Sequence, residues 1–220
     1  MASIAVLSSL ALKGVLEEFK PSFERSLGAP LELRFDATQA ILTKLETVQT
    51  DLLVLTAEAI EELQKDHRVT QVRMLGSSGV GVAVRAGAPK PDIGSVEALK
   101  RALAAARSVA HSKVGASGIY FAELLERLDI TLQERIVVEK GPVGLVVASG
   151  EAELGVQQLC ELAPVPGIDI VGPLPAPLQK LTSFSAAIPA AAAHPEGALA
   201  LIELLRSDAG LLELARVMAI

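Results

Sequence analysis

The alternation of short apolar strands with helical patterns is the feature that most restricts the fold of this chain. The first instance is IAVL at 4–7, which runs through Ser8 and Ser9 directly into the helical pattern at 10–24. Apolar residues at helical spacing and a following glycine, Gly28, mark this helix and its end. Strands that alternate with helices are typical of a mostly parallel sheet covered by helices. The sequence therefore predicts an α/β fold.

The same alternation continues along the rest of the chain. Further strands are expected at 31–35, 51–55, 79–87, 108–112, 135–139, 152–159, 168–172 and 182–188. Further helices are expected at 37–45, 57–65, 92–108, 117–128 and 142–149, with two more from Pro195 onward.

Two loop clusters, GSSG at 76–79 and GPLPAPL at 172–178, bracket the middle of the chain. They predict two lobes with a ligand cleft between them. Residues 1–79 with 184–220 would form the first, discontinuous lobe, and residues 80–183 the second.

Composition argues against several classes of function. Aromatic residues make up 3% of the chain and Trp is absent, which argues against a stacking surface for sugars or single-stranded nucleic acid. The net charge of −6 and the lack of a dense Lys/Arg run argue against a nucleic-acid or membrane-surface partner. The single cysteine, Cys160, excludes an internal disulfide and a cysteine-based zinc cluster, and we expect it to be a small buried residue.

Two locations are compatible with the opening residues. No run approaches the ~18 uncharged apolar residues of a membrane span, so no membrane insertion is expected. Met1-Ala2-Ser3 precedes a strand rather than a basic and then an apolar segment, so the chain as written is expected in the cytoplasm. If it is instead a trimmed mature form with an added Met1, it would be periplasmic, with a transporter permease as a partner.

Hydroxyl side chains recur where the expected strands give way to helices. They are Ser8 and Ser9, Thr38, Thr56 and Ser117. Open α/β sheets bind ligands beyond the carboxyl ends of their strands, where the first turn of a helix leaves backbone N–H groups free. Helix capping, worth about 1 kcal/mol, is the alternative for any single hydroxyl. Four such junctions predict a site for a small anion or carboxylate.

Four segments resemble the type 2 periplasmic-binding-protein family, in the branch related to molybdate-binding transport proteins and an aconitate isomerase. They are VLSSLALKGVLEEF, GASGIYFAELLERL, ASGEAELGVQQL and VGPLPAPLQKLTSFSAAI. The resemblance covers essentially the whole chain and implies two α/β lobes that close on a ligand. It also implies that hydroxyls and N–H groups at Ser9, Thr38 and the turn from Ala116 through Ser117 to Gly118 hold the ligand.

A tyrosine of the molybdate binders is replaced here by Gln158. An amide both donates and accepts hydrogen bonds, so it suits a ligand with carboxylate and hydroxyl groups at least as well as a tetrahedral oxyanion. Successive residues of a strand point to opposite faces, so only one of Gln157 and Gln158 can face the cleft, and we favour Gln158. The alternative is that this pair lies on a solvated edge.

Three further side chains near the Ser117 turn are weaker candidates. Tyr120 lies one turn into its helix and is either a ligand-facing phenol or a core residue with its hydroxyl at the rim. His111 is either a proton-transfer group or a loop histidine. Lys113 either supplies positive charge to an anionic ligand or is solvated.

The chain has no GxSxG, HExxH, Walker A or helix-opening GxGxxG motif, so no cofactor or metal is expected. Acidic runs are interpreted as solvated helix faces. The favoured function is binding of a small anionic solute. The alternative is an isomerase of a small polycarboxylate such as aconitate on the same scaffold, and a ligand sensor is a third class.

Overall fold

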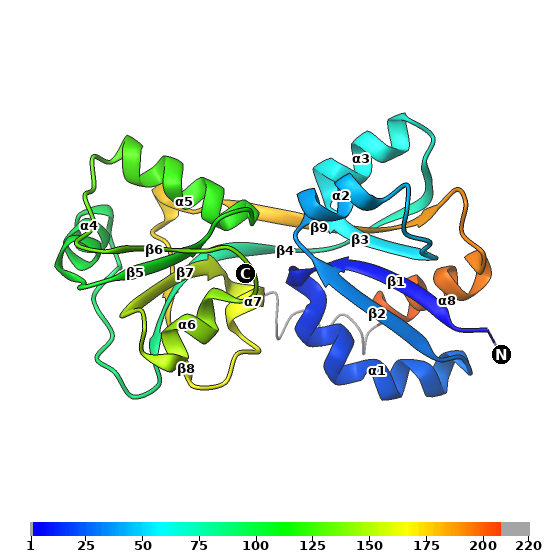
Figure 1. Cartoon of the computed structure of the whole chain (residues 1–220), viewed down its shortest axis with the longest axis horizontal. Coiled ribbons are helices and arrows are strands. Elements are labelled where there is room, and N and C mark those ends of the chain that lie inside the picture. The colour runs from blue at the N-terminus through cyan, green and yellow to red at the C-terminus, as the bar shows by residue number, and fades with distance from the viewer. Residues whose placement is uncertain (1, 208–220) are drawn as a thin grey trace. The chain divides into compact units, whose positions relative to one another are not determined.

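The computed structural model describes residues 2–207, which form two compact α/β units. Unit 1 comprises the residues up to Ser77 and those from Thr182, and unit 2 is Ser78–Leu181. Two strands, β4 (Val69–Arg85) and β9 (Leu181–Pro189), belong to both units, as Figure 1 shows. The α/β class predicted from the sequence is confirmed.

Unit 1 is built around β1 (Ile4–Ser9), which lies between β2 (Leu31–Asp36) and β3 (Leu52–Thr56) and runs parallel to both, while β9 runs antiparallel to β3. Its other elements are the 3-10 helix η1 (Leu10–Leu12), α1 (Lys13–Leu27), α2 (Thr38–Lys44), α3 (Ala57–Lys65) and α8 (Pro195–Leu205). Figure 1 shows α2 and α3 on one face of the sheet and α1 and α8 on the other. Because helices cover both faces, β3 is apolar and buried from Leu52 to Leu55.

In unit 2, β5 (Val109–Ser112) lies between β6 (Arg135–Val138) and β7 (Leu154–Gln158) and runs parallel to both, while β4 is antiparallel to β7 and β8 (Ile168–Pro173). The other elements are α4 (Val96–Ala105), α5 (Ala116–Arg127), α6 (Val143–Ser149), α7 (Leu159–Leu162) and the 3-10 helix η2 (Ala176–Leu178). Val109 packs into the core formed with α4 and α5, and the next residue, Ala110, packs against α6. Helices therefore cover both faces of this sheet as well.

Helix ends follow the glycine signals. Gly28 and Gly150 have φ values of 64° and 84°, and each ends its helix as the sequence predicts. The helix expected at 92–108 is opened by Ser95 as predicted, because the Ser95 hydroxyl accepts a hydrogen bond from Ala98 N, but α4 is shorter and ends at Ala105. Of the two helices expected from Pro195, α8 is present and any second one lies outside the described residues.

The prediction for β4 is wrong at its start, because the strand begins at Val69 rather than at 79. Its first half pairs with β9, which lies more than a hundred residues further along the chain. The strand is anchored on both sides of the unit boundary. In unit 1 the Ser77 and Ser183 hydroxyls lie 2.8 Å apart, and in unit 2 the Gln179 amide bonds both the N–H and the C=O of Val80 at 2.8 and 3.0 Å.

Candidate ligand site

The predicted hydroxyls of unit 1 lie at the carboxyl ends of its parallel strands. Ser9, the last residue of β1, is in register with Asp36, the last residue of β2. Thr38 is the first residue of α2, directly after β2, and Thr56 ends β3. Ser8, Ser9, Thr38 and Thr56 therefore share one edge of the unit 1 sheet.

Ser9 stands out among these residues because its hydroxyl is buried and has no hydrogen-bond partner. The residue is 4% exposed, and Oγ is the one buried side-chain polar atom in residues 2–207 that lacks a partner. Ser9 also precedes η1 without a side-chain capping bond, and Thr56 precedes α3 in the same way. Ser8 differs, because its hydroxyl donates to the Ser9 carbonyl oxygen at 2.9 Å. Helix capping therefore does not explain the presence of a hydroxyl at Ser9.

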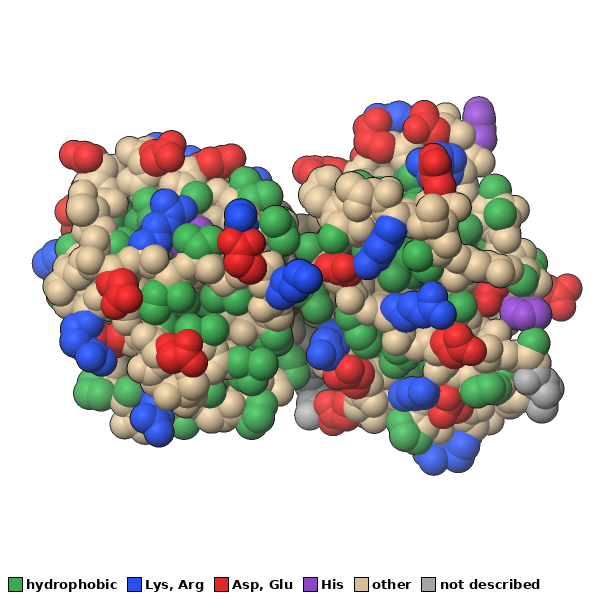
Figure 2. All heavy atoms as spheres, viewed as in Figure 1, with side chains coloured by type: hydrophobic (Ala, Val, Ile, Leu, Met, Phe, Trp, Pro, Cys, Tyr) green, Lys and Arg blue, Asp and Glu red, His purple; other side chains and the backbone are tan. Residues whose placement is uncertain are grey.

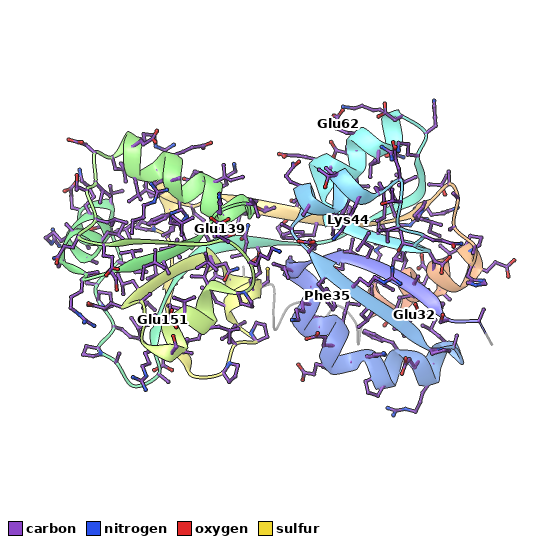
Figure 3. All side chains as sticks on the ribbon, viewed as in Figure 1. Glu32, Phe35, Lys44, Glu62, Glu139 and Glu151 are labelled. Atoms are coloured by element: carbon purple, nitrogen blue, oxygen red, sulfur yellow. The ribbon has the colours of Figure 1, made fainter. Side chains whose placement is uncertain are left out.

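The cations near this edge are already engaged. Lys44 Nζ lies 2.6 Å from Asp36 Oδ2, and Lys13 Nζ lies 3.8 Å from Glu17 and 5.9 Å from the centre of the Phe35 ring. Figure 3 labels Phe35 and Lys44 near the ends of β2 and α2. On the face shown in Figure 2, acidic and basic side chains are interspersed over both units rather than gathered by sign. Recognition of an anion at this edge would therefore depend on neutral donors.

Unit 2 has a corresponding edge, formed by the carboxyl ends of β5, β6 and β7. Ser117 and Gly118 lie in the first turn of α5, and both are buried. The backbone approaches β5 closely here, because a Cβ on Gly118 would lie 1.8 Å from the Ser112 carbonyl oxygen. The Ser112 hydroxyl accepts a hydrogen bond from Gly115 N at 3.0 Å and holds the turn that precedes α5. Ser117, Gly118 and Gln158, the last residue of β7, thus share one strand edge.

His111 is a buried residue of β5, so the interpretation as a loop histidine is wrong. Arg135 Nε donates to His111 Nε2 at 2.8 Å, so the ring proton belongs on Nδ1, which donates to the Ser112 carbonyl oxygen at 2.9 Å. The Phe121 ring packs against the imidazole edge to face, with the ring centres 5.5 Å apart. Burial lowers the pKa of His111, and the charge of Arg135 acts in the same direction. The imidazole is therefore a neutral structural group with both nitrogens engaged.

We expect His111 to make the protein less stable in acid. Below the ordinary imidazole pKa of about 6.5, the unfolded chain binds a proton that the folded state does not bind until lower pH. As pH falls from 7.5 to 5, the unfolding free energy of the wild type should therefore decrease more than that of His111→Asn. Urea denaturation at the two pH values measures this shift. The exposed His67, changed to Asn, is the matched control. If the unfolding free energy of His67→Asn differs from that of the wild type with the same pH dependence, the effect does not come from the buried His111.

Lys113 and Tyr120 already have partners. The Lys113 ammonium bonds both carboxylate oxygens of Glu139 at 2.8 and 3.0 Å. The Tyr120 hydroxyl donates to the Leu178 carbonyl oxygen at 2.7 Å, and its ring belongs to the core of unit 2. These contacts favour the core alternative for Tyr120.

The two glutamines at the end of β7 are both buried, so the alternative of a solvated edge is wrong for them. Gln157 Oε1 accepts a hydrogen bond from Val143 N at the start of α6, and Gln157 Nε2 donates to Glu161. Burial raises the pKa of Glu161 to about 7. The sequence interpretation missed Glu161 because it assigned acidic residues to solvated faces. The signal it overlooked is that Glu161 directly follows LGVQQLC, a run without charge that is buried throughout.

The described part of the chain gives little support to a reactive thiol, a metal site or a membrane-spanning helix. Cys160 is buried as expected, and burial raises the pKa of its thiol, which makes it unreactive. Within residues 2–207 there is no cluster of three or more His, Cys, Asp or Glu side chains placed to hold a metal ion. No helix in that range has the length and apolar character to span a bilayer.

Comparisons with known proteins agree on one family. A model of the bacterial extracellular solute-binding proteins matches residues 4–214. An aconitate isomerase from Pseudomonas sp is 40% identical over 223 residues, which cover 94% of this chain and 83% of that protein. The periplasmic molybdate-binding protein of Azotobacter vinelandii superposes with a TM-score of 0.74 at 16% identity, over 97% of both chains. A tungstate ABC transporter protein from Geobacter sulfurreducens gives 0.70 at 14% identity, again over 97% of both. These structures show the two-lobed α/β fold.

Proposed function

Because this chain belongs to the family of bacterial extracellular solute-binding proteins, we propose that it binds a small anionic solute, a carboxylate or an oxyanion. The observation that carries the proposal is the buried Ser9 hydroxyl without a partner. A buried polar group left unpaired costs about 1 to 3 kcal/mol, and a ligand oxygen would remove that cost.

The proposed ligand residues come from both strand edges. They are Ser8, Ser9, Thr38 and Thr56 in unit 1, and Ser117, Gly118 and Gln158 in unit 2, with Tyr120 the least favoured. The proposed functional lobes are residues 1–79 with 184–220 and residues 80–183. Gln158 and neutral hydroxyls favour a carboxylate-bearing solute, because an amide can pair with both its carboxylate and its hydroxyl groups.

Replacing Ser9 with alanine should weaken binding by roughly 1 to 3 kcal/mol, which is about 5- to 150-fold in the dissociation constant. The same change should leave the free energy of unfolding unchanged or slightly higher, because it removes a hydroxyl that makes no hydrogen bond in the protein. Calorimetric titration with molybdate, citrate and trans-aconitate, together with urea denaturation, measures both quantities.

The exposed Ser26 of α1, changed to alanine, is the matched control and should keep wild-type affinity. The anion to titrate is first found by thermal shift, since a ligand at 100-fold its dissociation constant adds about 2.7 kcal/mol of stability. Wild-type affinity in Ser9→Ala would reject this site.

A second candidate function is the isomerisation of a small polycarboxylate such as aconitate. The observation that favours it is the 40% identity to an aconitate isomerase over nearly the whole chain. Moving a double bond next to carboxylates requires a proton to leave one carbon and return to another. Incubation with trans-aconitate in deuterated water tests this function, because the isomer should form if the reaction occurs, and it carries deuterium where the removed proton exchanges with solvent.

The family consists of extracellular proteins, so a cytoplasmic location has no support, and we propose the periplasm. The proposed partner is then the permease of an ABC transporter. Neighbours in fold include the substrate-binding domain of a putative molybdenum ABC transporter of Clostridium difficile, which supports this partner.

A further inference from the structure

Glu161 is a half-buried carboxyl at the strand edge that carries the proposed unit 2 ligand residues. It lies in the first turn of α7, directly after β7, three residues beyond Gln158. No residue of β7 or α6 carries a charge, and both elements pack against α7. The third element packed against α7 is β8, whose one charged residue, Asp169, accepts a hydrogen bond from Gly87 N at 2.9 Å. Within the described residues, Glu161 is therefore an acid without a cationic partner.

The backbone of α6 fixes how Glu161 is held. Val143 N donates to Gln157 Oε1 at 2.9 Å, so the other end of that amide, Nε2, must be the one that meets Glu161 Oε2. Oε2 is thus an acceptor whether the carboxyl is protonated or not. The exchangeable proton therefore belongs on the other oxygen, Oε1.

We propose that Glu161 Oε1 is the atom that removes and returns the proton in an isomerisation of an unsaturated polycarboxylate at this site. The proposal rests on the second candidate function. Glu161 would be the catalytic acid–base group, and Gln157 its positioning residue.

The step balances without any further reactant. The Glu161 carboxylate takes a proton from the CH₂ carbon beside the double bond, and the C–H electron pair forms a new double bond while the old one shifts its electrons to the far carbon. The far carbon then takes the proton back from Oε1. One C–H bond breaks and one forms, the double bond moves by one position, and Glu161 returns to its starting state.

Burial suits Glu161 both to removing the proton as a base and to returning it as an acid. A pKa raised to about 7 lets the group give and take a proton near neutral pH. The other candidates near this strand edge are already committed. The His111 ring has both nitrogens bonded, Lys113 pairs with Glu139, and the Tyr120 hydroxyl bonds Leu178.

The test compares Glu161→Gln with Glu151→Gln, a control at the exposed Glu151 labelled in Figure 3. Each protein is incubated with trans-aconitate in deuterated water, and deuterium entry and isomerisation are followed. We expect Glu161→Gln to lose 10²–10⁴-fold in turnover, with its dissociation constant for trans-aconitate changed less than about threefold. Glu151→Gln should keep wild-type turnover. Glutamine mimics the protonated carboxyl, so thermal unfolding should show a folded variant.

A pH profile gives a second readout with a variant that keeps a carboxyl. In the wild type, kcat/KM should fall as the pH drops below about 7, where Glu161 becomes protonated. This acidic limb of the profile should lie at a different pH in Glu161→Asp. Wild-type turnover in Glu161→Gln, or an unmoved limb in Glu161→Asp, overturns the proposal. Trans-aconitate that binds the wild type and neither isomerises nor exchanges deuterium also overturns it and leaves the binding function standing. If no anion binds the wild type, the proposed function fails as well.

Discussion

Changing Gly118 to alanine should lower the free energy of unfolding by about 3 kcal/mol and abolish ligand binding. The new Cβ would lie 1.8 Å from the Ser112 carbonyl oxygen, which is a backbone atom and cannot rotate away as a side chain can. This oxygen is also held in place, because His111 Nδ1 donates to it. The start of α5 must therefore move away from β5, which displaces Ser117. Urea denaturation and calorimetric titration measure the two effects.

Gly94 provides the matched control for this prediction. Its Cβ would meet only the Asp92 carboxylate oxygen, at 3.3 Å, and that side chain can rotate. Gly94→Ala should therefore cost less than about 1 kcal/mol. If Gly118→Ala and Gly94→Ala unfold at the same urea concentration, α5 does not approach β5 as closely as described.

Removing the Asp51 carboxylate should destabilise the protein by about 2 to 4 kcal/mol, because it leaves two partly buried backbone donors unpaired. Asp51 Oδ2 accepts from Ala5 N at 2.9 Å, and Oδ1 accepts from His194 N at 2.8 Å. One buried side chain thus joins the first strand of unit 1 to the start of α8, although these segments lie at opposite ends of the sequence. Urea denaturation of Asp51→Ala measures the loss.

The exposed Asp66, changed to alanine, is the control for charge removal and should unfold close to wild type. Asp51→Asn should be intermediate, since its amide can accept from one N–H but must turn its NH₂ group toward the other. A loss below about 0.5 kcal/mol in Asp51→Ala would show that this link contributes little.

Local signals were enough for most of the fold. DLLVL is a continuous apolar run because helices cover both faces of β3, and Gly28 and Gly150 end helices because they adopt positive φ. The first half of β4 could not be predicted in this way. Its residues are largely exposed or half-buried, and its pairing partner β9 is remote in sequence.

The sequence likewise predicts some features of the candidate site and not others. Strand-to-helix junctions are visible in the sequence, so Ser9, Thr38 and Ser117 could be selected as candidates. Which hydroxyl lacks a partner depends on tertiary packing, and so does the state of the titratable groups. Arg135 fixes the His111 tautomer from 24 residues away, and Glu161 acquires its altered acidity from burial beside Gln157.

The placement of Tyr120 gives the protein an intrinsic spectroscopic probe of one unit. It is the single tyrosine in a chain without tryptophan, and it is buried in unit 2 beside the cations Arg127 and Lys180. Tyrosine emission therefore reports on unit 2 alone, whereas far-ultraviolet circular dichroism averages the helices of both units. If the two signals change at different denaturant concentrations, the units unfold separately. Comparing tyrosine emission with circular dichroism then shows, without an added label, which unit unfolds first.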